Sequence, residues 1–127
     1  SIPFLPNWNA GQVIKAMPAF INFQNGKGIR YLTEYAQYAA PLNNYDLFYT
    51  FQGITDDGKY YISAILPVTH PSLPADSNVG DAIQNQLYSD FDGYKREAVA
   101  ALEAQPLDSF TPDLNQLDAM IQSFKVH

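Results

Sequence analysis

The sequence predicts an α+β fold in which a mainly antiparallel sheet of four or five strands is covered by C-terminal helices. Aromatic and β-branched residues alternate through the first half, and two such runs flank Asp56-Asp57-Gly58, a strong hairpin signal. In the last third, apolar residues recur at steps of three and four, which is typical of amphipathic helices. We expect one domain over residues 1–127, made of an N-terminal arm (1–11), a sheet (12–70) and helices (80–125).

Composition narrows the class of protein. With 127 residues, 46% of them hydrophobic and 16% charged, the chain can bury a core of its own. A net charge of -6 disfavours nucleic acid and anionic membrane surfaces as partners. The absence of cysteine excludes disulfides and thiolate metal sites, and the absence of a long apolar run argues against direct membrane insertion by this domain.

The first eleven residues predict an extended arm. Pro3 and Pro6 restrict the backbone there and remove hydrogen-bond donors. We expect the arm to dock on the domain through Phe4, Leu5 and Trp8.

The first strand pair is predicted on either side of Asn25–Gly28, whose residues tolerate positive φ. Pro18 lies within the first strand and indicates an edge position or a bulge. One face of this strand is expected to carry the apolar odd positions, Val13, Met17, Ala19, Ile21 and Phe23. The second strand should place Ile29, Tyr31, Thr33 and Tyr35 on one face.

The strongest strand pair is predicted over residues 46–55 and 60–68. In the first strand, one face should carry Leu47, Tyr49 and Phe51, and the other face Phe48, Thr50 and Gln52. In the second strand, one face should carry Tyr60, Ile62, Ala64 and Leu66, and the other face Tyr61, Ser63 and Ile65. Both faces are substantially apolar. We therefore expect helices on one face, and a loop, the arm or a second subunit on the other.

Helices follow a Pro- and Ser-containing linker over residues 70–78. The apolar spacing predicts one helix over about 90–104, preceded by a shorter one from Gly80, with Gly93 as an irregularity. Pro106 ends this helix. Thr111 is then predicted to cap a last helix with Pro112 at its first position, so that the helical segments cover 80–105 and 112–125.

Catalytic motifs are weak throughout the chain, and we predict no metal site and no cofactor. Asp56-Asp57-Gly58 is best explained as a turn, and Asp90-Phe91-Asp92-Gly93 lacks the ligand spacing of a calcium loop. The enzyme hypothesis that remains is a hydrolase acting on an envelope polymer, with Glu34, Asp46 or His70 as acid or base.

Aromatic residues are concentrated at the start of the chain, where 13 of the 18 lie within the first 61 positions. The simplest explanation is cross-strand pairing and core packing. The functional hypothesis is a partly exposed platform that stacks on sugar rings or contacts a partner protein. The candidate binding residues are Tyr31, Tyr35, Tyr49, Tyr61 and Trp8, with Tyr38 and Tyr45 nearby in the sequence.

Two segments carry a resemblance to a known group. Asn25–Thr33, with its Asn-Gly-x-Gly start, and Phe48–Tyr61 resemble domains of uncharacterised secreted or lipid-anchored bacterial proteins over residues 12–75. The ending Ile121-Gln122-Ser123-Phe124-Lys125 is similar, more faintly, to PsbP-like lipoprotein domains. The resemblance implies an extracytoplasmic location at the cell envelope and transfers no catalytic residue.

These observations favour a non-enzymatic extracytoplasmic domain of a bacterial secreted protein or lipoprotein, acting in binding or assembly with a protein or glycan. The alternatives are the envelope hydrolase and a purely structural or homodimerisation module.

Overall fold

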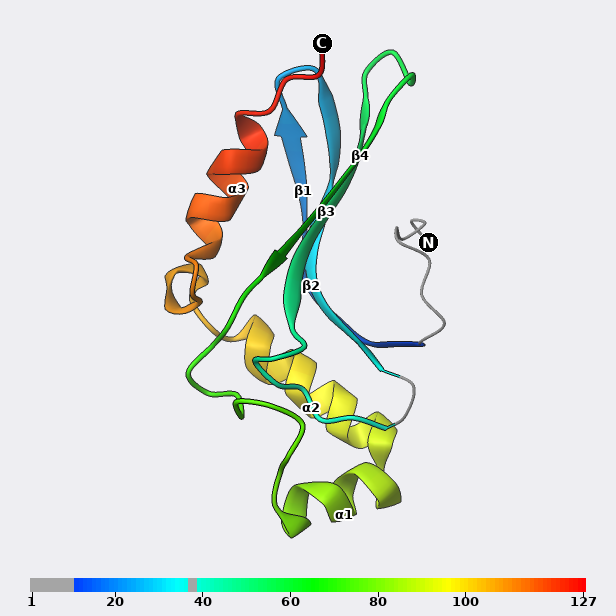
Figure 1. Ribbon diagram of the computed structural model, residues 1–127, viewed down its shortest axis with the longest axis vertical. Helices are drawn as coiled ribbons and strands as arrows, with labels where there is room; N and C mark the ends of the chain where they lie inside the picture. Colours follow the sequence, from blue (N-terminus) through cyan, green and yellow to red (C-terminus); the bar gives the residue numbers. More distant parts are fainter. Residues whose placement is uncertain (1–10, 37–38) are drawn as a thin grey trace.

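The computed structural model describes residues 11–36 and 39–127. They form a four-stranded sheet whose order, β1-β2-β3-β4, follows the sequence, with each neighbouring pair antiparallel (Figure 1). The predicted α+β class and antiparallel sheet are confirmed, with four strands. The strands are β1 (Gly11–Phe23), β2 (Gly26–Ala36), β3 (Phe48–Thr55) and β4 (Tyr61–Pro67).

The helices follow the sheet in sequence and cover one of its faces (Figure 1). Both α2 and α3 contact β1, whereas α1 packs on α2. In the described part of the chain, the helices are too short and too polar to span a membrane. The helical elements are α1 (Asp81–Ser89), α2 (Phe91–Glu103), the short 3-10 helix η1 (Leu107–Ser109) and α3 (Leu114–Gln122).

The sequence predicted the position of the β3–β4 turn correctly and that of the β1–β2 turn less well. Asp56-Asp57-Gly58 forms the β3–β4 turn as predicted, with Gly58 at φ 73° and the Asp57 carboxylate accepting from Lys59 N–H at 2.9 Å. The β1–β2 turn consists of Gln24 and Asn25, so β2 begins at Gly26, earlier than expected.

Glycine is required inside β2 because an aromatic ring lies over the strand. Gly28 pairs with Gly53, and a Cβ on Gly28 would come within 2.6 Å of the Phe51 ring. The two facing glycines thus make room for Phe51, which also meets Phe23 edge-on at 6.0 Å between ring centroids. The predicted turn residues Gly26 and Gly28 act in packing instead.

A bulge interrupts β1 between Ala16 and Ala19, with Met17 at φ 55°. The interruption at Pro18 is confirmed, and it shifts the alternation of the strand. Before the bulge, the even-numbered Ile14 and Ala16 are buried; after it, the core residues are the odd-numbered Ile21 and Phe23. The predicted odd-numbered apolar face is therefore confirmed after the bulge, at Ile21 and Phe23, and wrong before it, where Ile14 and Ala16 are the core residues.

Carboxylates cap the N-termini of α2 and α3. Asp90 accepts from Gly93 N–H at 3.0 Å and caps α2; a side chain at Gly93 would collide with this carboxylate. The cap of α3 is Asp113, which accepts from Asn115 N–H at 2.8 Å. The prediction that Thr111 caps this helix was wrong, because Thr111 instead forms a two-way backbone bridge with Thr69.

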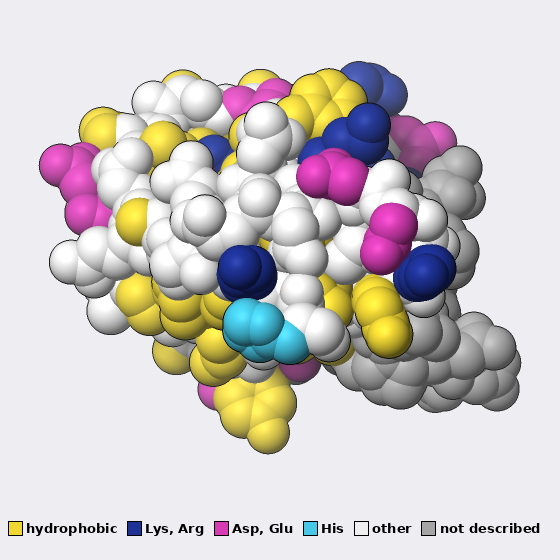
Figure 2. All heavy atoms as spheres, turned by 90° about the horizontal axis from the view of Figure 1, so that it is seen from above, with side chains coloured by type: hydrophobic (Ala, Val, Ile, Leu, Met, Phe, Trp, Pro, Cys, Tyr) yellow, Lys and Arg dark blue, Asp and Glu magenta, His cyan; other side chains and the backbone are white. Residues whose placement is uncertain are grey.

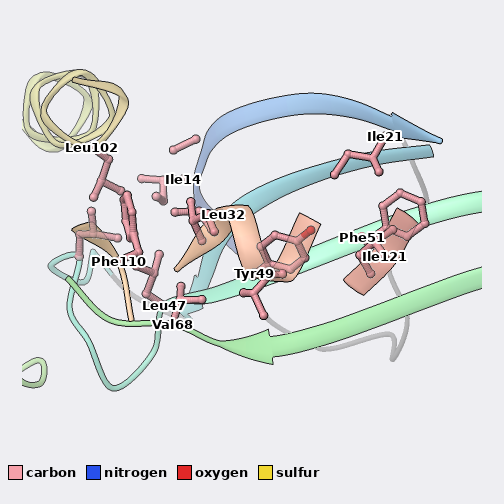
Figure 3. Close-up of a cluster of buried hydrophobic side chains, with 14 of the residues drawn as sticks. Ile14, Ile21, Leu32, Leu47, Tyr49, Phe51, Val68, Leu102, Phe110 and Ile121 are labelled. Carbon is pink, nitrogen blue, oxygen red and sulfur yellow. The ribbon is translucent and has the colours of Figure 1, made fainter. Parts of the chain in front are cut away.

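The hydrophobic core lies between the sheet and the helices. Figure 3 shows Leu47, Val68, Leu102 and Phe110 gathered at one end, and Phe51 with Ile121 at the other. The core extends beyond the sheet, so the segments after β4 are held by the same cluster as the strands.

Candidate functional site

The two faces of the sheet differ in what covers them. The helix-covered face, called here the inner face, carries Leu32, Tyr49 and Phe51 in the core. We call the opposite side the outer face; it consists of Lys15, Phe20 and Asn22 on β1, Lys27, Ile29, Tyr31, Thr33 and Tyr35 on β2, Phe48, Thr50, Gln52 and Ile54 on β3, and Tyr61, Ser63, Ile65 and Pro67 on β4. These assignments confirm the predicted alternation of β2, β3 and β4.

Tyr31 lies on the outer face and is buried, with 3% of its surface exposed. The Lys15 ammonium is 4.7 Å from the centroid of its ring. Burial raises the pKa of Tyr31, and the nearby Tyr35 and Tyr61 add to the shift. Tyr35 is half-buried and stacks on Phe48 with 6.2 Å between ring centroids. Three of the predicted tyrosines are therefore neighbours on this face.

Tyr61 is the most accessible of the three, with 44% of its surface exposed. Its hydroxyl donates to Gln52 Oε1 at 2.7 Å, and Gln52 Nε2 donates to Thr50 Oγ1 at 2.8 Å and to Ser63 Oγ at 3.0 Å. These polar side chains of the outer face thus form hydrogen bonds with one another within the sheet. This network holds the Tyr61 hydroxyl in place while part of the residue remains exposed to solvent.

Three large apolar side chains accompany Tyr61 at the surface of the outer face. Phe20 is 89% exposed, Ile54 41% and Ile65 39%. Phe20 was not among the predicted binding residues; it lies on the outer face because it alternates with the buried Ile21 and Phe23 of the same strand.

Tyr49 does not belong to the outer face. It is fully buried on the inner face, where Figure 3 shows it inside the core near Leu32. Its hydroxyl donates to Asp118 Oδ1 at 2.8 Å, and burial together with this bond raises its pKa. Tyr49 therefore cannot stack on an external ligand in this structure, contrary to its place among the predicted binding residues.

The remaining aromatic candidates do not extend the outer face. Trp8 and Tyr38 lie outside the described residues. Tyr45 is 83% exposed but lies in the turn before β3 rather than on a strand.

Two of the three predicted acid or base residues share a partner. Asn43 donates its backbone N–H to Glu34 Oε1 at 3.0 Å and its side-chain amide to Asp46 Oδ2 at 3.0 Å. Glu34 is fully buried, and its Oε2 has no hydrogen-bond partner in the described structure. Burial raises the pKa of Glu34 to about 8, the Asn43 N–H opposes the shift, and the Asp46 charge adds to it.

His70 is buried in a separate cluster. Ser72 N–H donates to its Nδ1 at 3.1 Å, so the ring proton is on Nε2, which faces Ser109 Oγ at 2.9 Å. Ser109 Oγ itself donates to Pro106 O at 2.6 Å. Burial lowers the pKa of His70, in agreement with a neutral ring. The ring lies 4.7 Å from that of Phe110, so His70 joins the loop after β4 to the segment before α3.

Hollows lined by described residues lie elsewhere, between β1 and α2. The larger has a volume of about 420 Å³ and is shallow; basic side chains of Lys15, Lys95 and Arg96 line it together with Glu103. Acidic and basic side chains are also interspersed on the end of the molecule seen in Figure 2, with no continuous surface of one sign there. Within the described residues, no group of three or more metal-ligating side chains forms a cation site.

Comparison with protein-family models, with curated proteins and with solved structures found no match to this chain.

Proposed function

We propose that this domain is a non-enzymatic binding or assembly module of a bacterial secreted protein or lipoprotein, and that its outer face contacts a protein partner. The observation that carries the proposal is the exposure of Phe20, 89%, on the same face of the sheet as the partly exposed Ile54, Tyr61 and Ile65. Exposed aromatic and aliphatic side chains above a rigid sheet are typical of protein contact surfaces.

A protein partner fits this surface better than a glycan. Sugar-binding platforms depend on accessible flat rings, yet Tyr31 is buried and two of the exposed residues, Ile54 and Ile65, are aliphatic. The extracytoplasmic location is part of the proposal and is supported by the resemblance to secreted and lipid-anchored bacterial domains. Fractionation of the native cells tests it, with recovery in the cytosolic fraction as the contrary result.

Photo-crosslinking in the native organism tests the binding surface. A photoreactive amino acid replaces Phe20 in one version of the chain and Tyr88 in another. Tyr88 is a suitable control because it is 85% exposed but lies on α1, away from the sheet. We expect a protein adduct from position 20 and none from position 88. Equal adducts from both positions, a glycan adduct, or no adduct from position 20 would count against the proposal.

An envelope hydrolase is the second candidate, because Asn43 brings the carboxyl groups of Glu34 and Asp46 together and the pKa of Glu34 is raised to about 8. Against it stands the complete burial of Glu34. Hydrolysis of cell-wall or envelope polysaccharide by the purified domain, lost in Glu34→Gln, would favour this candidate over the binding module.

A further inference from the structure

The β1–β2 turn holds the C-terminal segment, the residues that follow α3. Gln24 N–H donates to Phe124 O at 2.8 Å, and the Gln24 side chain donates to Gln122 O at 3.3 Å. The side-chain amide of Asn25 donates to Val126 O at 2.7 Å, and Asn25 Oδ1 accepts from Val126 N–H at 3.0 Å. Figure 1 shows this segment running past α3 to the turn. The two turn residues therefore attach the C-terminal segment to the sheet.

The pairing of Asn25 with Val126 requires a side-chain amide. An amide carries a donor and an acceptor side by side, so Asn25 bonds to the backbone of Val126 as a neighbouring strand would. An aspartate side chain would keep the acceptor and lose the donor. The fold therefore depends on asparagine at this position.

Gly26 is equally required at the next position. It pairs with Phe23 on one side and with Thr55 on the other, and a Cβ on Gly26 would come within 2.6 Å of Ile54 O. A backbone oxygen inside a sheet cannot move aside as a flexible side chain can, so larger residues are excluded. The structure thus requires an Asn-Gly pair here, and the sequence contains no other.

An Asn-Gly pair is chemically labile, because glycine has no side chain to hinder attack by its own backbone nitrogen on the preceding amide. Gly26 N forms a bond to Asn25 Cγ, and the amide nitrogen of Asn25 leaves as ammonia after taking up the proton of Gly26 N–H. Water then opens the cyclic imide and leaves either aspartate or isoaspartate at position 25. The reaction consumes water, releases ammonia and involves no oxidation or reduction.

We propose that Asn25 is a site of spontaneous deamidation, that the docked C-terminal segment slows the reaction, and that the reaction in turn releases this segment. Attack requires Asn25 Cγ to approach Gly26 N, and the two hydrogen bonds to Val126 restrain the side chain from doing so. After the reaction, an acidic oxygen replaces the group that donated to Val126 O, so that two acceptors face each other. Undocking of the segment therefore becomes permanent.

Release of the C-terminal segment would also affect the core and the neighbouring turn. Phe124 and Val126 pack against the core cluster, so their apolar surface becomes exposed when the segment leaves. Asn25 O accepts from Asp56 N–H at 2.9 Å, which joins the β1–β2 turn to the β3–β4 turn. Isoaspartate lengthens the backbone between Asn25 and Gly26 and would displace this contact as well.

The first test measures the rate of the reaction in the purified domain at mildly alkaline pH, by mass spectrometry of the peptides that contain Asn25 and Asn22. We expect conversion at Asn25, faster in urea than in the folded state, and none at Asn22, which precedes phenylalanine. Equal rates in the folded and unfolded chains would overturn the proposal, as would the absence of conversion at Asn25.

A matched pair of variants tests whether the C-terminal segment controls this rate. Val126→Pro removes the N–H that donates to Asn25 Oδ1 and should accelerate deamidation of the folded domain roughly fivefold, the effect expected for one hydrogen bond. Val126→Ala also shortens the side chain but keeps the N–H, and should react at nearly the wild-type rate. Equal rates for the two variants would contradict control by the segment.

The second test measures release of the segment without relying on a proline variant. Lys125 is exposed between Phe124 and Val126, both of which bond to the turn, so trypsin should cut after Lys125 only when the segment undocks. Asn25→Asp should raise the cleavage rate at this bond several-fold. Asn22→Asp adds the same charge at an exposed position of the same strand and should leave the rate unchanged. Equal cleavage of both variants would overturn the proposal.

Discussion

The inner and outer faces of the sheet handle polar groups in different ways. On the inner face, Arg30 forms an ion pair with Asp118 of α3 at 3.2 Å and donates to Met17 O, so its contacts join distant segments. On the outer face, Thr50 donates to Ala64 O and Gln52 donates to Ser63, so the contacts stay between adjacent strands. The inner face therefore links segments that are distant in sequence, and we expect it to determine global stability, whereas the polar groups of the outer face bond to one another and leave room for exposed side chains.

Asp118→Ala should cause a large loss of stability, about 3–5 kcal/mol, because it leaves the buried Arg30 guanidinium without its carboxylate. Urea unfolding measures this loss. The control is Asp92→Ala, which breaks the exposed pair with Lys95 and should cost less than about 1 kcal/mol. Equal losses for the two variants would contradict the role assigned to the inner face.

Glu34 should make stability depend on pH. Its pKa is about 8 in the folded state against an ordinary 4.5, so the folded state retains the proton as pH rises between these values. The contribution of Glu34 to stability should be fully present below about pH 4.5 and be lost, by a few kcal/mol, as pH rises through 8. Glu34→Gln should flatten the curve, and Glu97→Gln, an exposed control, should not. Unfolding measured at several pH values between 4.5 and 8 tests this prediction. If the free energy of unfolding changes with pH as steeply in Glu34→Gln as in the wild type, Glu34 is not the group responsible.

Tyr49→Phe should cost about 1–3 kcal/mol, since it removes only the hydroxyl that donates to the Asp118 carboxylate at 2.8 Å. Tyr61→Phe removes a hydroxyl that donates to a neutral amide on the outer face at 2.7 Å, and should cost less than about 1 kcal/mol. Thermal unfolding of the two variants compares the faces directly. A larger loss for Tyr61→Phe would reverse the conclusion.

Phe20→Ala should change stability by less than about 0.5 kcal/mol, the smallest effect, because the ring is 89% exposed. Phe23→Ala makes the same change on the same strand but on the opposite face, where the side chain is 5% exposed, and should cost about 3–5 kcal/mol. Chemical denaturation of this pair checks the face assignments after the bulge. Similar losses at positions 20 and 23 would show that the assignments fail.

Local patterns were enough to predict much of the fold. The alternation of β2, β3 and β4 and the turn at Asp56-Asp57-Gly58 depend on neighbouring residues, and all were predicted. Pro18 indicated the bulge in β1, but the sequence did not show that the core residues before it would be the even-numbered Ile14 and Ala16. A single inserted residue changes the side of the sheet that a side chain occupies.

The candidate site was less predictable, because burial is a tertiary property. Tyr49 and Tyr31 have similar sequence surroundings, yet only the position of α3 places Asp118 beside the Tyr49 hydroxyl. Arg30 and Asp118 are 88 positions apart, and no spacing rule connects them. The shared contact of Glu34 and Asp46 with Asn43 likewise depends on how the segment before β3 folds back on β2.

The most direct test of the division between the faces combines two measurements on Phe20→Ala. A photoreactive amino acid at position 54, on the same outer face, reports contact with the partner in native cells, and urea unfolding reports stability. We predict that Phe20→Ala lowers the adduct yield roughly tenfold while the unfolding free energy stays at the wild-type value. An undiminished adduct, or a loss of stability comparable with that of Phe23→Ala, would contradict the account.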